Sequence, residues 1–143
     1  AASAPFTNRK CHGMLVFNNK MWIIGGETTG YTNDVWSSSD GVSWTMATAS
    51  APFTARSGHA SFVYNGRMWV IGGKYSGGPP YYTNDVWSSA DGATWTPATM
   101  GAAFTIRSSP GAAVFKSTMW IVGGIATSGG TATNDVWMAA YGK

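Results

Sequence analysis

One motif occurs three times along this chain, and its repetition constrains the fold more than any other feature. The stretch TNDVWSSSDGVSWT at 32–45 returns as TNDVWSSADGATWT at 83–96, and TNDVWMAAYGK follows at 133–143. A diglycine precedes each copy, at 25–26, 72–73 and 123–124. Segments that repeat in register about every fifty residues predict one supersecondary unit per repeat, each stacked on its neighbours.

Each unit contains four segments that are typical of strands. The first occupies 13–19, 60–66 and 111–117 and ends in a turn-like pair, and MWIIGG, MWVIGG or MWIVGG follows at once. The third segment carries NDVW, and the fourth surrounds Trp44 or Trp95 after an Asp-Gly turn. No segment has helical spacing of apolar residues. The second segment is apolar at four consecutive positions, so both of its faces must be covered, which favours small sheets stacked face to face.

The composition agrees with a turn-rich β protein and excludes several functions. The chain is 44% hydrophobic but only 10% charged, against about 25% charged in an average soluble protein. Lys and Arg form no run, so we expect no nucleic-acid partner. No apolar run reaches the length of a membrane helix, so we expect no membrane partner. The few charges and the start at Ala1 without Met indicate an exported protein, secreted or extracytoplasmic.

The repeat resembles the Kelch repeat, in which a diglycine after an apolar strand is followed by a loop and a Trp-bearing strand. The form NDVW-S-S-x-DG-x-x-W, with R-x-x-H upstream, is similar to bacterial Kelch and galactose-oxidase-like propeller repeats. The resemblance covers almost the whole chain, as one unit of 1–143 with repeats at about 4–50, 51–101 and 102–143. It implies an all-β fold of three four-stranded antiparallel propeller blades, the third without its outer strand.

We interpret the recurring motif residues as parts of the framework, because packing needs them in every unit whereas a single site does not. The glycines allow positive φ or a close backbone approach. Asn and Asp are expected to tie the incoming loop to the blade, and the Trp side chains to fill the layer between blades. The set comprises Gly25, Gly26, Asn33, Asp34, Trp36, Gly72, Gly73, Asn84, Asp85, Trp87, Gly123, Gly124, Asn134, Asp135 and Trp137.

Three blades do not close a propeller, since closed rings have about four to eight. Each bare blade face would present on the order of 300–500 Å² of apolar surface from strand spacing, and leaving it open forgoes roughly 8–12 kcal/mol. We favour a head-to-tail pair of chains that forms a six-bladed ring and lacks only the equivalents of residues 43–47. The alternatives are a portion of a longer chain or an open array such as a filament. In each case the NDVW strand of the third blade has a bare edge that can accept a donated strand.

Arg9, Arg56 and Arg107 occupy equivalent positions just before the first strand of each unit. Because that strand lines the channel of Kelch propellers, the resemblance places the three side chains around one channel mouth, where they would suit an anionic peptide or sugar acid. The alternative is that each Arg pairs with the motif Asp and stitches neighbouring blades together. The second interpretation carries more weight, because one Arg and one Asp per blade is what stitching predicts.

The segments between the diglycine and NDVW, at 27–32, 74–83 and 125–133, differ in length and are expected to be solvent loops. They carry Tyr31, Tyr75, Tyr81 and Tyr82 among Gly and Pro. Exposed Tyr in such a setting makes an adaptable contact surface for protein or carbohydrate. The alternative is that the tyrosines only shield the rim of the blade.

An enzymatic role has little support. Galactose-oxidase-like chemistry would need two His and two Tyr ligands for copper and a Cys–Tyr thioether. The two histidines, His12 and His59, are equivalent, the third repeat has Pro110 in their place, and Cys11 is the single cysteine. We therefore expect no metal, no cofactor and no catalytic residue. The sequence predicts a binding scaffold, or alternatively a structural building block of a larger assembly; a fragment of a galactose-oxidase-like enzyme is a third choice.

Overall fold

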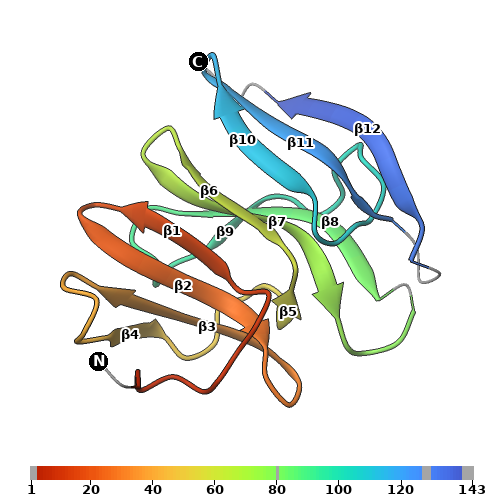
Figure 1. Cartoon of the computed structure of the whole chain (residues 1–143). Coiled ribbons are helices and arrows are strands. Elements are labelled where there is room, and N and C mark those ends of the chain that lie inside the picture. Colours follow the sequence, from red (N-terminus) through yellow and green to blue (C-terminus); the bar gives the residue numbers. More distant parts are fainter. Residues whose placement is uncertain (1–2, 80, 127–129, 140–143) are drawn as a thin grey trace.

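The computed structural model describes residues 3–79, 81–126 and 130–139, which fold into three antiparallel sheets that lie one after another in chain order (Figure 1). Blade 1 contains β1 (Gly13–Phe17), β2 (Lys20–Glu27), β3 (Tyr31–Ser38) and β4 (Thr45–Thr48). Blade 2 contains β5 (Arg56–Ser57), β6 (Ala60–Tyr64), β7 (Arg67–Tyr75), β8 (Tyr82–Ser89) and β9 (Thr96–Thr99). Blade 3 contains β10 (Gly111–Phe115), β11 (Thr118–Ile125) and β12 (Ala132–Ala139). The all-β architecture of three antiparallel blades, the third without a fourth strand among the described residues, confirms the prediction.

In every blade the strand that carries the diglycine forms a tight hairpin with the strand just before it, as their spacing predicts; these hairpins are β1–β2, β6–β7 and β10–β11. In blade 1 the two turn residues, Asn18 and Asn19, have φ values of 49° and 57°. Two successive left-handed residues match the right-handed twist of the strands in a two-residue hairpin, and Asn tolerates that conformation well. The hairpin sets the register, with Phe17 opposite Lys20 and Gly13 opposite Ile24.

The diglycines interrupt the register between the strand that carries them and the NDVW strand, in the pairs β2–β3, β7–β8 and β11–β12. In blade 2 the pairing shifts between Ile71 and Gly73. A Cβ atom added to Gly72, which has a φ of 62°, would lie 2.9 Å from the carbonyl oxygen of Arg107 in the next repeat. Glycine at this position therefore supplies both a left-handed backbone and the space for the main chain of the following blade.

Three details differ from the sequence-based expectation. The outer strands β4 and β9 begin after Trp44 and Trp95, so these indoles precede the strands rather than lying within them. The short strand β5 pairs with β7 and carries no apolar pattern that would predict it. The ends of the expected solvent loops belong to strands, since β2 extends to Glu27 and β3 begins at Tyr31, whereas residues 28–30 and 76–79 between the strands are not strand. Pro80 and residues 127–129 of these segments, like 140–143, lie outside the described residues.

The core consists of two apolar layers, one at each junction between blades. The first joins blade 1 to blade 2 and contains Leu15, Phe17, Trp22, Ile24, Val35, Ala51, Phe53, Met68, Val70, Trp87 and Trp95. The second joins blade 2 to blade 3 and contains Ala60, Trp69, Ile71, Val86, Phe104, Met119 and Ile121. The inner strand β6 contacts both β1 and β10. Stability therefore comes from packing between neighbouring blades, as in other repeat architectures. The described part of the chain has no helix suited to crossing a membrane.

Candidate functional site

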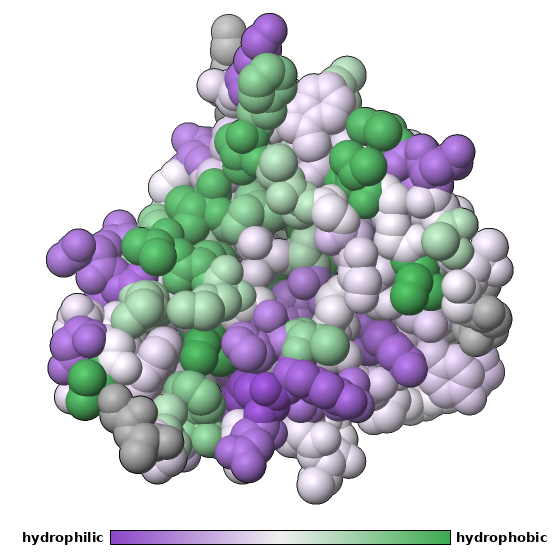
Figure 2. Space-filling view, viewed as in Figure 1, coloured by the Kyte–Doolittle hydropathy of each residue, from purple (hydrophilic) through white to green (hydrophobic). Residues whose placement is uncertain are grey.

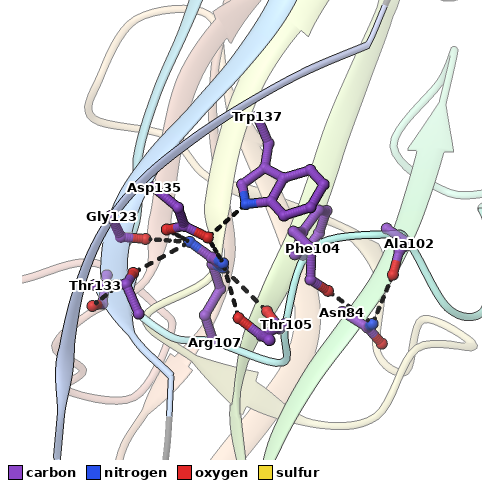
Figure 3. Close-up of polar contacts among 10 residues, drawn as sticks. Asn84, Ala102, Phe104, Thr105, Arg107, Gly123, Thr133, Asp135 and Trp137 are labelled. Atoms are coloured by element: carbon purple, nitrogen blue, oxygen red, sulfur yellow. Dashed lines mark hydrogen bonds and ion pairs between the residues drawn. The ribbon is translucent and has the colours of Figure 1, made fainter.

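Each repeat contains one bidentate ion pair between the arginine before its first strand and the aspartate of its NDVW motif. In blade 3, Nη1 and Nη2 of Arg107 donate to the two carboxylate oxygens of Asp135 at 2.7 and 2.6 Å (Figure 3). Arg9 pairs with Asp34 in blade 1, and Arg56 with Asp85 in blade 2. Two parallel N–H···O bonds match the planar guanidinium to the carboxylate, which makes the pair specific as well as strong.

Main-chain acceptors and an aromatic ring complete the surroundings of each guanidinium. Arg107 Nη1 also donates to the carbonyl of Gly123 at 2.7 Å, and Nε donates to the carbonyl of Thr105 at 3.0 Å (Figure 3). The guanidinium carbon lies 5.4 Å from the ring centroid of Phe104, within the range of a cation–π contact. The arginine side chains are 2%, 0% and 0% exposed in blades 1, 2 and 3. These groups are therefore engaged within the fold rather than presented to solvent.

The hydrogen bonds hold the motif carboxylates in the ionised state. Burial raises the pKa of Asp85, but the hydrogen bonds from Arg56 and the indole of Trp87 outweigh it, so that pKa lies below its usual value. The pKa of Asp135 is likewise lowered, first by its hydrogen bonds from Arg107 and from Trp137. A permanently ionised carboxylate that accepts from two side chains has no proton to transfer near neutral pH, so this arrangement favours a framework role over acid–base chemistry.

The main chain of the same arginine, rather than its ion pair, joins neighbouring blades. Arg107 donates its backbone N–H to the carbonyl of Thr83 at 3.1 Å and accepts from the N–H of Gly73 at 2.8 Å, and both partners belong to blade 2. Its side chain binds Asp135 of blade 3. The pairing of Arg with the motif Asp, which we favoured from the sequence, is thus present, but each ion pair lies within one blade and the stitching runs through backbone hydrogen bonds.

The motif asparagine makes a second connection between blades. Asn84 Nδ2 donates to the carbonyls of Ala102 and Phe104 at 2.8 and 3.0 Å (Figure 3). The main-chain carbonyl of Asn84 accepts from the backbone N–H of Ala102 at 3.0 Å. Asn33 holds Ala51 and Phe53 in the same way. The expectation that Asn ties the incoming loop is wrong, because it ties the outgoing chain at the start of the next repeat. Asn134 is the third member of this set, and it is exposed.

The four tyrosines are not one exposed cluster. Tyr81 is 39% exposed, whereas Tyr82 is 7% exposed and lies at the start of β8. Tyr31 and Tyr75 are half-buried at strand ends. Tyr81 lies just before β8 and has a φ of 60°, whereas Tyr82 is the first residue of that strand. The prediction of an exposed Tyr surface is therefore wrong for Tyr82, and only Tyr81 of this set has a largely open side chain.

The two histidines lie near the first diglycine, His59 beside Gly25 and His12 beside Gly26. His59 is buried, and burial followed by the charge of Arg56 lowers its pKa to about 3. His12 has an unpartnered Nδ1 and a pKa lowered first by burial. Cys11 is exposed. No group of three or more His, Cys, Asp or Glu residues in the described ranges has the arrangement of a metal site.

Two elements of this network escaped the sequence analysis. The aromatic residue under each arginine, Phe6, Phe53 or Phe104, recurs three positions before the Arg, and this spacing was a usable signal. The role of the arginine backbone left no signal, since a main-chain hydrogen bond does not depend on the residue type.

The comparisons with known proteins agree with this geometry. Residues 2–141 match the family model described as the KLHDC2/KLHL20/DRC7 Kelch-repeats domain. The search of curated proteins found no match. Kelch domains are generally non-enzymatic scaffolds that bind protein partners. With its diglycine bulges, its Arg–Asp pairs and a match over nearly its whole length, this chain belongs to the Kelch-repeat family.

Proposed function

We propose that this chain is a non-enzymatic Kelch scaffold that assembles head to tail with a second copy and binds a partner through the turns that follow its diglycine strands; the channel mouth is not part of this proposal, because the three arginines expected there are buried and paired within the fold. One observation carries the assembly: the two outer faces of the three-blade stack carry apolar residues at positions equivalent to those that fill its buried junctions. Such faces complement each other in a heterologous contact, which closes into a ring if the rotation fits.

The face that blade 3 turns away from blade 2 is open. Phe115, Val122 and Val136 on this face are 58%, 47% and 58% exposed. The equivalent residues of blade 1, which is followed by another blade, are Phe17, Ile24 and Val35, and they are 8%, 0% and 0% exposed. A following blade therefore removes these positions from water, and covering them in blade 3 would supply the same hydrophobic stabilisation.

The outer face of blade 1, at the opposite end of the stack, is the surface that would pack on the open face of blade 3 of a second copy. In the internal junction, Phe53 and Trp95 of blade 2 pack edge to face at 5.3 Å and are 1% and 4% exposed. Their equivalents in blade 1, Phe6 and Trp44, keep the same edge-to-face contact at 5.3 Å but are only half-buried. Exposed hydrophobic side chains also lie over β1, among them Met14 and Val16 (Figure 2). Large exposed apolar patches of this kind are typical of interaction surfaces.

The motif asparagine of the third repeat, Asn134, allows the head-to-tail contact between two copies to be tested by a single substitution. In both internal junctions the equivalent side chain binds two carbonyls at the start of the next repeat. In a head-to-tail pair, the corresponding acceptors for Asn134 are the carbonyls of Ala4 and Phe6 of the second copy. Asn134→Ala removes this contact without touching either internal junction.

The experiment is a mass measurement in solution by analytical ultracentrifugation over a range of concentrations. We expect the wild-type chain to form a species of twice the chain mass of 15.1 kDa, and Asn134→Ala to shift the equilibrium toward the monomer with unchanged circular dichroism. The matched variant Asn84→Ala is expected to lower the melting temperature of the fold itself. A wild-type chain that stays monomeric at all concentrations overturns the assembly, and species that grow beyond the dimer favour the filament instead of the ring.

For the partner, the turns at 28–30 and 76–79, with Tyr81 nearby, support either a protein or a carbohydrate ligand. Tyr81 is the side chain in this set with the most accessible ring, and Tyr presents a large contact area at low entropic cost. A glycan array with wild type and Tyr81→Ala separates the two. Glycan signals that disappear in the variant support carbohydrate binding, and an array without signals leaves a protein as the partner.

An extracytoplasmic location also belongs to this proposal, supported by the low content of charged residues. Fractionation of the source cells tests it: recovery of the protein in the cytoplasmic fraction contradicts the proposed location but leaves the assembly untouched.

A further inference from the structure

In every blade, the turn of the hairpin that precedes the diglycine carries one exposed cation. Lys20 and Arg67 directly follow the turns of blades 1 and 2, and Lys116 lies within the turn of blade 3. The turns β1–β2, β6–β7 and β10–β11 lie in a row along the upper left of the molecule (Figure 1). The fold therefore gathers on one side three positive side chains that lie far apart in the sequence.

No acidic side chain of the described ranges pairs with these three cations. The ion pairs found there lie toward the diglycine ends of the blades, and none of them includes Lys20, Arg67 or Lys116. Asp40 and Asp91 follow β3 and β8 at the same end of the blades as the cations. Their carboxylates accept from backbone N–H groups of their own turns at 2.7–2.9 Å. The hairpin turns therefore present positive charge that is available to a ligand.

The turns are held in place by a hydrogen bond that recurs in every blade. Trp22, Trp69 and Trp120 each donate the indole N–H to the main-chain carbonyl of the last residue before the turn, at 2.9, 2.9 and 3.2 Å. Tyr64 also donates its hydroxyl to the carbonyl of Ser117 at 2.7 Å, which ties the turn region of blade 2 to that of blade 3. Because the turns are preorganised, a ligand that binds across them has little loop ordering to offset.

The spacing of the blades indicates the shape of an anionic ligand. Sheets that pack face to face lie about 10 Å apart, so cations of successive blades are separated by about that distance. A polyproline II segment has about three residues per turn and rises about 3.1 Å per residue. Every third side chain of such a segment therefore lies on one face, at intervals of about 9 Å. In a β-strand, residues three apart point to opposite faces instead.

The composition of the turns also favours a ligand with an open main chain. Asn18, Asn19 and Asn65 are exposed, and their side-chain amides can both donate and accept hydrogen bonds. The main chain of polyproline II has no internal hydrogen bonds, so its polar groups are free to bind these amides. An α-helix uses its main-chain groups internally and could not use the amides in this way.

We propose that the turns at 18–20, 65–67 and 116–118 bind an acidic protein segment in the polyproline II conformation, with a carboxylate at every third residue. Each carboxylate lies beside the cation of one blade, and the amides of the turns bind the main chain between the carboxylates. This surface consists of three complete hairpins and lies at the opposite end of the blades from the turns that follow the diglycine strands. It uses neither the open faces of blades 1 and 3 nor a second copy of the chain.

The test measures binding of two labelled peptides to the intact chain by fluorescence anisotropy at low salt. The peptide GEPPEPPEPPG has a glutamate at every third position, and GPPPEEEPPPG has the same composition with its glutamates adjacent. We expect the spaced peptide to bind at least about threefold more tightly, because the clustered one cannot reach all three cations and one exposed ion pair is worth about two- to fivefold. Its affinity should fall as salt is added, because exposed charges are screened. Equal affinity of the two peptides, or an affinity that salt does not change, overturns the proposal.

A matched pair of variants locates the site, because Arg67 and Lys74 are exposed cations at opposite ends of β7. Arg67→Gln should weaken binding of the spaced peptide about two- to fivefold, and the combined change of Lys20, Arg67 and Lys116 to Gln by about tenfold or more. Lys74→Gln alters the net charge equally and should leave the affinity unchanged, and circular dichroism should be unchanged in every variant. An equal loss from Lys74→Gln indicates attraction by net charge alone and overturns the proposal. Binding of dextran sulfate without binding of either peptide also overturns it and assigns the turns to an anionic polysaccharide.

Discussion

Replacing Arg56 by Met tests whether the buried ion pair belongs to the framework of the fold or to a ligand site. Arg56 is 0% exposed, and its guanidinium donates to Asp85 and to the carbonyls of Thr54 and Gly72. Met fills much of the same volume but supplies neither charge nor donors. Asp85, which is 5% exposed, would remain as a buried carboxylate with the indole of Trp87 as its neighbouring donor.

The expected cost is large compared with the stability of a domain. Breaking a buried ion pair by removing one partner destabilises a protein by about 3–5 kcal/mol, whereas a typical domain has a total stability of roughly 5–15 kcal/mol. Arg107→Met should cost less, because the side chain of its partner Asp135 is 33% exposed and water can solvate it, while that of Asp85 is 7% exposed. Arg56→Lys keeps the charge but loses the bidentate geometry, so its cost should lie between that of Arg56→Met and zero.

The assay is urea denaturation followed by tryptophan fluorescence, with all variants at one protein concentration because assembly would shift the apparent stability. The reasoning is refuted if Arg56→Met changes the free energy of unfolding by less than about 1 kcal/mol, the range of a surface ion pair. It is also refuted if Arg107→Met proves the more damaging change. A stable Arg56→Met protein that loses a ligand would instead support the recognition role.

Two further predictions concern single positions at the blade junctions. Burial lowers the pKa of His59 from 6.5 to about 3. Between these two pH values the unfolded chain binds a proton that the folded chain does not, so the free energy of unfolding should fall by about 2–3 kcal/mol from pH 7 to pH 4.5. His59→Leu should flatten this dependence of stability on pH. A profile unchanged by His59→Leu would show that other groups cause the slope. Gly72→Ala should destabilise the fold by at least about 1–2 kcal/mol, because of its left-handed backbone and the carbonyl of Arg107 at 2.9 Å from the added Cβ. Gly101→Ala, with nothing within 4 Å, should stay within about 0.5 kcal/mol, and equal melting temperatures for the two variants would contradict the argument.

The blades could be predicted from the sequence because their determinants are local and recur. The apolar run at each second strand, the two-residue turn before it and the diglycine after it occur three times in register. A pattern that is weak in one copy, such as MWIIGG, becomes informative when MWVIGG and MWIVGG stand at equivalent positions. The pairing of Arg56 with Asp85 followed from the same logic, since one base and one acid per repeat require a common role.

What escaped prediction depends on contacts that residue type does not record. Strand β5 forms because Arg56 and Ser57 lie beside Tyr75 and Lys74 in the folded chain, not because of their own propensities. Tyr82 was placed among exposed tyrosines from the polar loop around it, but it is the first residue of a strand and its side chain is buried. The direction of the asparagine contact, toward the following repeat, depends on how the chain leaves β4 and β9, which sequence spacing alone does not determine.

The arrangement of Asn84 and Arg107 has a consequence for the number of repeats. The second repeat reaches forward with the side chain of Asn84, and the third reaches backward with the main chain of Arg107, while the ion pair of each repeat is internal. The hydrogen bonds at both ends of a repeat therefore involve groups that recur in the repeat, and they can form with another copy of the same unit. A further repeat inserted between two existing ones could form both sets of hydrogen bonds with its neighbours, without compensating changes in their sequences. Gene duplication can thus lengthen or shorten such a protein one blade at a time, so that ring size can change without a new interface having to arise.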